Sequence, residues 1–167
     1  MTPTLAGAVT EARFKELMST FPSGVTVVTA VDQNGVPHGL TCSSLCSVSL
    51  HPPLLLVCVN NRSRTLAVIR ERATFAVNML HTGGREASET FSTGGVDRFR
   101  RVPWRRTPAR ALPWLSLHSH AVAECELRRD MRAGDHTILI GEVVDITMHE
   151  SATPLMYGLR QYASWPT

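Results

Sequence analysis

The feature that most constrains the fold is residues 37–65, which hold two strand-like segments, a proline pair between them and a helix start. Residues 54–59 are continuously apolar, as expected of a strand covered on both faces. Ser63 is a good N-cap for a helix over residues 64–72. The first strand contains a run of small, mostly polar residues, Gly39-Leu40-Thr41-Cys42-Ser43-Ser44. Hydroxyls, backbone amides and an arginine would therefore surround one cleft, and this lining suits a flat, phosphorylated ligand better than a metal or a DNA groove.

Strand-length segments and turn signals recur along the rest of the chain. Residues 25–31 are dense in β-branched side chains, and Asn34-Gly35 is a strong hairpin signal, so the chain should return antiparallel through residues 37–49. Further strands are expected over residues 54–59, 74–80, 114–127, 136–148 and 155–157, with a turn at 128–135. Short helices are expected after Thr10 and over residues 64–72 and 85–92. Six or seven antiparallel strands with a few short helices predict a mainly β barrel in one domain.

The composition is that of an ordinary globular domain. The chain has 167 residues, of which 43% are hydrophobic and 19% are charged, so it can bury a substantial core. The net charge is only +3. No apolar run approaches the roughly 20 residues that cross a bilayer, and the N-terminus lacks the regions of a signal peptide. We therefore expect a cytoplasmic protein with no membrane partner, and a flexible tail over residues 1–9.

The cysteines and histidines do not form a metal-binding pattern. The four cysteines are Cys42, Cys46, Cys58 and Cys125. Their spacing is not that of a zinc site, and we expect reduced, mostly buried thiols. His118 and His120 precede Cys125, but strand alternation places the two histidines on one face and the cysteine on the other. No metal site is therefore predicted.

Two short motifs could contact a ligand. At the helix start, unpaired N–H groups and the helix dipole attract phosphate. Ser63, Arg64 and Thr65 add hydroxyl and guanidinium donors there, although an ordinary capped helix with exposed arginines would have the same sequence. In the turn at residues 134–136, His136 could reach over a bound ring or be a half-buried turn residue.

A basic segment lies between residues 98 and 110, where Phe99 and Trp104 are interleaved with arginines. Nucleic-acid binding is one interpretation of this pattern. The charge is confined to one loop that begins beside Asp97, which favours a solvated loop or one that contributes to a nucleotide pocket. The chain has no nucleophile elbow, Walker loop or dinucleotide-binding glycine motif, so a cofactor would carry the chemistry of an enzyme.

Seven short motifs, in order along the chain, carry a resemblance to a known family. They lie at residues 21–29, 39–50, 52–54, 63–65, 75–78, 97–99 and 134–143. The chain resembles the flavin reductase family, the split-barrel proteins that supply reduced flavin to two-component flavin-dependent monooxygenases. The resemblance covers residues 10–162. It implies a homodimer of six-stranded antiparallel split β-barrels with short flanking helices, and FMN or FAD bound near the subunit interface.

The resemblance also assigns roles to individual residues. The isoalloxazine ring and its side chain would be held by Pro37, His38, Gly39, Leu40, Thr41, Ser43 and Ser44. The same pocket would be lined by Cys58, Val59 and Asn60, and the phosphate would be bound by Ser63, Arg64 and Thr65. His136, the catalytic residue, would lie near the nicotinamide of NADH or NADPH.

The reaction implied by the resemblance is hydride transfer from C4 of NADH or NADPH to N5 of the flavin, for which the protein orients the two rings. Reduced flavin would then diffuse to a partner monooxygenase. The alternatives are a split barrel that binds flavin without nicotinamide chemistry and an oxidase that holds FMN tightly. No nucleic-acid partner is expected.

Overall fold

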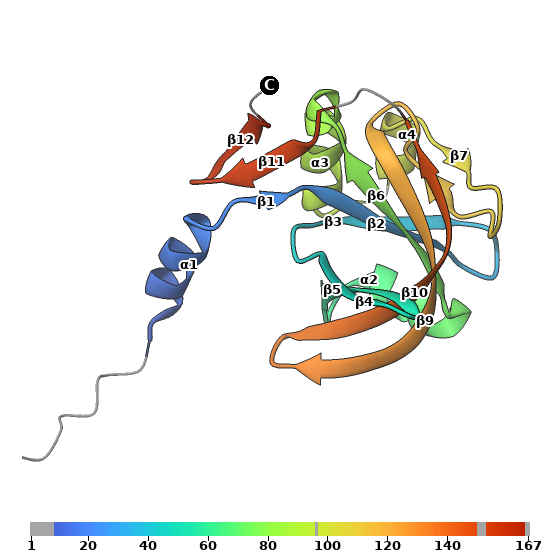
Figure 1. Ribbon diagram of the computed structural model, residues 1–167, viewed down its shortest axis with the longest axis horizontal. Coiled ribbons are helices and arrows are strands. Elements are labelled where there is room, and N and C mark those ends of the chain that lie inside the picture. The colour runs from blue at the N-terminus through green and yellow to red at the C-terminus, as the bar shows by residue number, and fades with distance from the viewer. Residues whose placement is uncertain (1–8, 96, 150–152, 166–167) are drawn as a thin grey trace, which may run out of the picture.

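The main element of the fold is a seven-stranded antiparallel sheet in the order β3-β2-β6-β9-β10-β5-β4 (Figure 1). The computed structural model describes residues 9–95, 97–149 and 153–165, so the predicted tail lies outside the described residues except for Val9. The strands are β2 Thr26–Val31, β3 Pro37–Cys42, β4 Cys46–Leu50, β5 Pro53–Asn60, β6 Thr74–Leu80, β9 Ser119–Ala133 and β10 His136–Met148. The sheet curls until β3 contacts β5, which closes a barrel. The predicted mainly β barrel is confirmed.

The strand predicted over residues 37–49 is divided into two strands. Residues 43–45 separate β3 from β4, and these two strands lie at opposite ends of the sheet. β3 pairs with β2, whereas β4 pairs with β5. The corner between them therefore crosses the gap where the barrel closes. Counted as one strand, β3 and β4 give the six strands of the predicted barrel.

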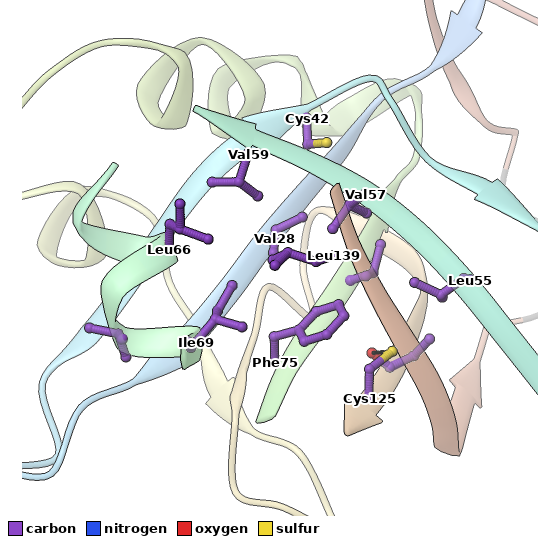
Figure 2. Close-up of a cluster of buried hydrophobic side chains, with 14 residues drawn as sticks. Val28, Cys42, Leu55, Val57, Val59, Leu66, Ile69, Phe75, Cys125 and Leu139 are labelled. Atoms are coloured by element: carbon purple, nitrogen blue, oxygen red, sulfur yellow. Dashed lines mark hydrogen bonds between the residues drawn. The ribbon is translucent and has the colours of Figure 1, made fainter. Parts of the chain in front are cut away.

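An apolar core fills the barrel, and helix α2 (Arg64–Arg72) packs against it (Figure 2). Figure 2 labels its main side chains, which include Val28, Val57, Val59, Leu66, Ile69, Phe75 and Leu139. The bounds of α2 agree with the sequence prediction, and Ser63 occupies the N-cap position, although its side chain makes no capping hydrogen bond. Gly141 gives Phe75 its space, because a Cβ at residue 141 would lie 2.5 Å from the ring.

The other helices flank the barrel unequally. They are α1 Glu11–Ser19, α3 Arg85–Ser92, the short α4 Arg98–Arg101 and a 3₁₀ turn at Thr82–Gly84. The side chain of Thr10 caps α1 as predicted, but α1 has no buried residue and stands away from the barrel in Figure 1. α3 contacts β3 and covers a second apolar cluster that includes Phe91. No helix in the described part of the chain has the length and hydropathy needed to cross a membrane.

Two small sheets complete the fold. β7 (Arg105–Arg106) pairs with β8 (Pro113–Trp114), and β1 (Ser23–Gly24) pairs with β11 (Leu155–Gly158), which in turn pairs with β12 (Gln161–Ser164). The sequence did not predict β12. The turn before it has Leu159 and Arg160 at φ of 51° and 59°. Two residues with positive φ suit a tight hairpin, but glycine and asparagine are the usual signals for it.

The turn predicted at residues 128–135 is shorter than expected. β9 continues to Ala133, and only Gly134 and Asp135 separate it from β10. Ion pairs support this extension, since Arg128 Nε lies 2.7 Å from a Glu142 carboxylate oxygen on the neighbouring strand. Such cross-strand pairs make a charged segment compatible with a strand.

Candidate functional site

A pocket of about 630 Å³ lies where the barrel closes, between β3 and α3 on one side and the end of β5 on the other. Eight of the residues predicted to contact ligand line this pocket, namely Leu40, Thr41, Ser43, Ser44, Cys58, Asn60, Ser63 and His136. The corner between β3 and β4, the start of α2 and the start of β10 therefore meet in one cavity, although they are far apart in the sequence.

The remaining predicted residues do not line the pocket. Pro37 and His38 lie at the far end of β3, where His38 Nε2 is 3.1 Å from a carboxylate oxygen of Asp32. That hydrogen bond lowers the pKa of Asp32. Gly39 is buried beneath the rings of Phe91 and Phe99.

One residue predicted to line the flavin pocket, Val59, and two of those predicted to bind the phosphate, Arg64 and Thr65, also lie off the pocket wall. Val59 belongs to the barrel core and is fully buried, and Thr65 is buried in α2 with 4% of its surface exposed. Arg64 is exposed. Alternation explains the position of Val59, because neighbouring residues of a strand point to opposite faces.

The side chain of Ser44 fixes the corner to the opposite wall. Its hydroxyl accepts the backbone N–H of Cys58 at 2.9 Å and donates to the carbonyl of the same residue at 3.3 Å. Cys42 Sγ lies 3.1 Å from the Ser44 hydroxyl. Thr41 ties β3 to α3, because its hydroxyl donates to the carbonyl of Ser88 at 2.6 Å. The pocket walls are therefore held in place by hydrogen bonds.

Arg98 brings a cation to the pocket that the site prediction did not include. Its Nη1 donates to the carbonyl of Gly39 at 2.7 Å, and its Nε is buried without a hydrogen-bond partner among the described residues. Burial lowers the pKa of Arg98. Since an arginine keeps its charge, a half-buried guanidinium without a carboxylate partner in the described structure is suited to an anionic ligand.

Gly39 positions this arginine through close packing. A Cβ at residue 39 would lie 3.0 Å from the ring of Phe91 and 3.2 Å from the ring of Phe99. The two rings meet edge to face with centroids 4.8 Å apart. The absence of a side chain at Gly39 therefore lets α4, which carries Arg98 and Phe99, lie directly on β3.

His136 lines another part of the wall, where it pairs with Asn60 across β10 and β5. Its Nδ1 lies 2.8 Å from a carboxylate oxygen of Asp135, and this hydrogen bond lowers the pKa of Asp135. An ionised Asp135 favours a proton on Nδ1 and leaves Nε2 for a ligand. The turn itself is fixed by the side chain of Asn61, which donates to the carbonyl of Gly134 at 3.0 Å.

The site prediction missed ten of the residues that line the pocket. They are Val25, Cys42, Ser88, Phe91, Ser92, Thr93, Gly94, Arg98, Tyr157 and Tyr162. The motif at residues 97–99 was a usable signal for Arg98, whereas the other arginines of the basic segment are exposed and do not line the pocket. The described residues contain no cluster of three or more potential metal ligands.

A barrel whose pocket is lined by hydroxyl-bearing residues, an arginine and a histidine has the groups that suit a flat, phosphorylated ligand. A family model described as "flavin reductase like domain" matches residues 18–166. The chain is 48% identical over 157 residues to a flavin reductase (NADPH) of Lentzea aerocolonigenes, covering 94% of this chain and 91% of the relative. It is 32% identical to the flavin-dependent monooxygenase reductase subunit HsaB of Rhodococcus jostii, covering 94% of this chain and 79% of the relative.

A solved structure extends the similarity to three dimensions. The NADH:FAD oxidoreductase SgcE6 of Streptomyces globisporus, in complex with NAD and FAD fragments, superposes with a TM-score of 0.88. It is 31% identical, and the match covers 96% of this chain and 98% of that one. The chain belongs to the flavin reductase like domain family, and the expected split-barrel fold is confirmed.

Proposed function

We propose that this protein is an NAD(P)H-dependent flavin reductase that uses the pocket between β3 and β5. The observation that carries the proposal is that Arg98, the hydroxyls of the β3–β4 corner and His136 line one cavity. When both substrates are bound, the reduced nicotinamide supplies a hydride to N5 of the flavin. The protein's own contribution is to orient two flat rings and to exclude water from between them.

On the flavin side, the isoalloxazine ring binds against the corner that Ser44 fixes to Cys58. Leu40, Thr41, Ser43 and Ser44 line this space. The hydroxyls of Thr41 and Ser44 already donate to backbone carbonyls and can accept from a ligand, whereas the Ser43 hydroxyl makes no hydrogen bond to another described residue. Arg98, rather than Arg64, receives a phosphate group, because Arg98 lines the pocket with a buried unpartnered Nε whereas Arg64 is exposed away from it.

On the nicotinamide side, His136 contacts the second ring. The carboxylate of Asp135 orients the imidazole through Nδ1, so that Nε2 remains available to the nicotinamide. Asn60 lies opposite His136 and Ser63 follows at the start of α2, which gives this part of the pocket polar side chains for the ribose or the carboxamide. No side chain has to transfer the hydride itself.

The reduced flavin leaves the pocket and serves a partner monooxygenase. The similarity to a monooxygenase reductase subunit supports this role. The flavin is FMN or FAD and the hydride donor is NADH or NADPH. Among the proteins similar to this chain, one is named for NADPH and another for NADH.

The protein acts as a homodimer. α1 carries Phe14, Leu17 and Met18, which are 56%, 64% and 47% exposed, and Phe21 follows the helix with 69% exposed. Apolar side chains gathered on one helix are normally covered, and a second copy of the chain is the proposed cover. Light scattering should give twice the chain mass, and Leu17→Glu should shift it toward one chain mass.

The direct test of the proposed function is a matrix of two flavins against two nicotinamides. Nicotinamide oxidation is followed at steady state with purified protein and excess flavin. We expect turnover that depends on both substrates in at least one of the four combinations. Absence of protein-dependent turnover in all four would contradict the proposed function.

A further inference from the structure

A pair of tyrosines stands on the C-terminal hairpin beside α3. Tyr157 of β11 and Tyr162 of β12 are cross-strand partners, and both line the pocket. Their rings meet edge to face, with centroids 5.2 Å apart and planes at 64°. In Figure 1 this hairpin lies beside α3, and the hydroxyls of Ser88 on α3 and Tyr162 on β12 join the two elements. Neither tyrosine has been given a role in the proposed reaction.

Tyr162 is fixed on several sides. Its hydroxyl is 2.9 Å from the hydroxyl of Ser88, and the guanidinium of Arg85 lies 5.2 Å from its ring centroid. Arg85 in turn donates to Glu89 at 2.8 Å, which holds the guanidinium in place. A cation over a ring and an anchored hydroxyl together make Tyr162 a rigid support rather than a free contact surface.

Tyr157 is the accessible member of the pair. It is 38% exposed, and its hydroxyl makes no hydrogen bond to another described residue. The edge-to-face contact with Tyr162 holds its ring in one orientation. The polar wall of Ser92, Thr93 and Arg98 belongs to the same pocket. An ordered aromatic face beside a cation and hydroxyls is the combination that binds a nucleotide, the ring by stacking and the phosphate by charge.

We propose that Tyr157 is a stacking platform for the adenine ring of a dinucleotide substrate, with Tyr162 as its support and Arg98 as the contact for the adjoining phosphate. The proposal rests on the proposed function, because FAD and the nicotinamide dinucleotide each bring an adenine ring. It makes the pocket a site for two ring systems, the reacting rings beside Ser44 and His136 and the adenine beside Tyr157. FMN has no adenine, so FMN and FAD must respond differently to changes at residue 157.

The test compares Tyr157→Ala with Tyr157→Phe in steady-state kinetics after the wild type has shown turnover. If FAD supplies the adenine, Tyr157→Ala raises the KM for FAD about tenfold, leaves the KM for FMN unchanged, and Tyr157→Phe behaves as wild type. If the nicotinamide dinucleotide supplies it, Tyr157→Ala raises the KM for that dinucleotide with either flavin. Either pattern supports the platform. Equal increases for FMN and FAD at unchanged nicotinamide KM, or no change at all, would overturn it.

A second readout does not require turnover. AMP carries the adenine and phosphate alone, and its binding is measured by calorimetry with wild type, Tyr157→Ala and the control Leu159→Asn. Leu159 is on the same hairpin, does not line the pocket and has a φ that asparagine tolerates. AMP should bind wild type and the control and bind Tyr157→Ala about tenfold more weakly. If Tyr157→Ala does not fold, Tyr157→Leu replaces it, and AMP binding that is equal in all variants contradicts the platform.

Discussion

The hydroxyl of Ser44 lies 2.9 Å from the backbone nitrogen of Cys58 and 3.3 Å from its carbonyl oxygen, so one side chain serves both backbone groups of a strand residue. The reason lies in the register. β4 pairs with β5 only as far as Leu56, opposite Cys46, so Cys58 has no partner on β4. Ser44 takes the place of the missing strand at the point where the barrel closes and the pocket opens.

Ser44→Ala is therefore expected to lower both stability and flavin affinity. Two hydrogen bonds are lost, and the free energy of unfolding should fall by about 1–2 kcal/mol, as measured by urea unfolding. Ser43→Ala is the matched control, since Ser43 lines the same pocket but is exposed and its side chain makes no hydrogen bond within the described structure. An unfolding free energy of Ser44→Ala equal to that of the control would contradict this account.

Arg98 and Arg64 are expected to respond differently to the same substitution. Arg98→Gln should weaken flavin binding about 10- to 100-fold, because a charge-assisted hydrogen bond in a half-buried site is lost. Arg64→Gln should leave flavin affinity within about twofold, because its side chain is exposed and off the pocket wall. Flavin fluorescence titration measures both. A larger loss of flavin affinity in Arg64→Gln than in Arg98→Gln would indicate that the phosphate binds at the start of α2 instead.

His136→Ala should weaken the use of the nicotinamide substrate without changing flavin binding. The KM for the nicotinamide is expected to rise about five- to tenfold, because one hydrogen bond to that ring is removed, whereas the dissociation constant of the flavin should not change. Asp135→Asn should give a smaller effect in the same direction, since it leaves the imidazole in place without its orienting carboxylate. A flavin dissociation constant that rises together with the nicotinamide KM would place His136 at the flavin instead.

His120 makes the stability depend on pH. Burial lowers its pKa, and the neighbouring His81 lowers it further. The folded protein therefore favours neutral His120. The contribution of this residue to the free energy of unfolding is fully present above the ordinary pKa of about 6.5, and it is lost as pH falls through the lowered pKa of the folded state. Melting temperatures measured between pH 7.5 and 5.5 should fall less steeply for His120→Gln than for wild type. His51→Gln, at an exposed histidine, should keep the wild-type slope, and equal slopes in all three proteins would be the contrary result.

Local signals in the sequence were sufficient for several elements. α2 begins after its predicted cap, Ser63, and β6 has its predicted bounds of Thr74–Leu80. The division between β3 and β4 was not predictable in this way. Residues 43–45, which separate β3 from β4, include no proline or glycine that would break a strand. The corner exists because closing the barrel places β3 and β4 at opposite edges of the sheet.

Only part of the site was predictable. Thr41, Ser44 and His136 follow from their motifs, whereas Tyr157 and Tyr162 reach the pocket through a hairpin whose turn lacks its usual residues. The phosphate contact illustrates the same limit. Arg64 and Arg98 carry the same group, and tertiary packing distinguishes them: Phe99 packs on Gly39, and Arg98 donates to the carbonyl of Gly39 at the pocket wall.

The most direct test of the central claim is hydride transfer measured without oxygen. Protein is mixed anaerobically with NADH or NADPH and with FMN or FAD, and the absorbance bands of the reduced nicotinamide and of the oxidised flavin are followed together. The account predicts that both bands fall at the same rate and in a one-to-one ratio, and that Arg98→Gln slows the process at limiting flavin. Bands that change no faster with protein than without it, in every combination, would contradict the account.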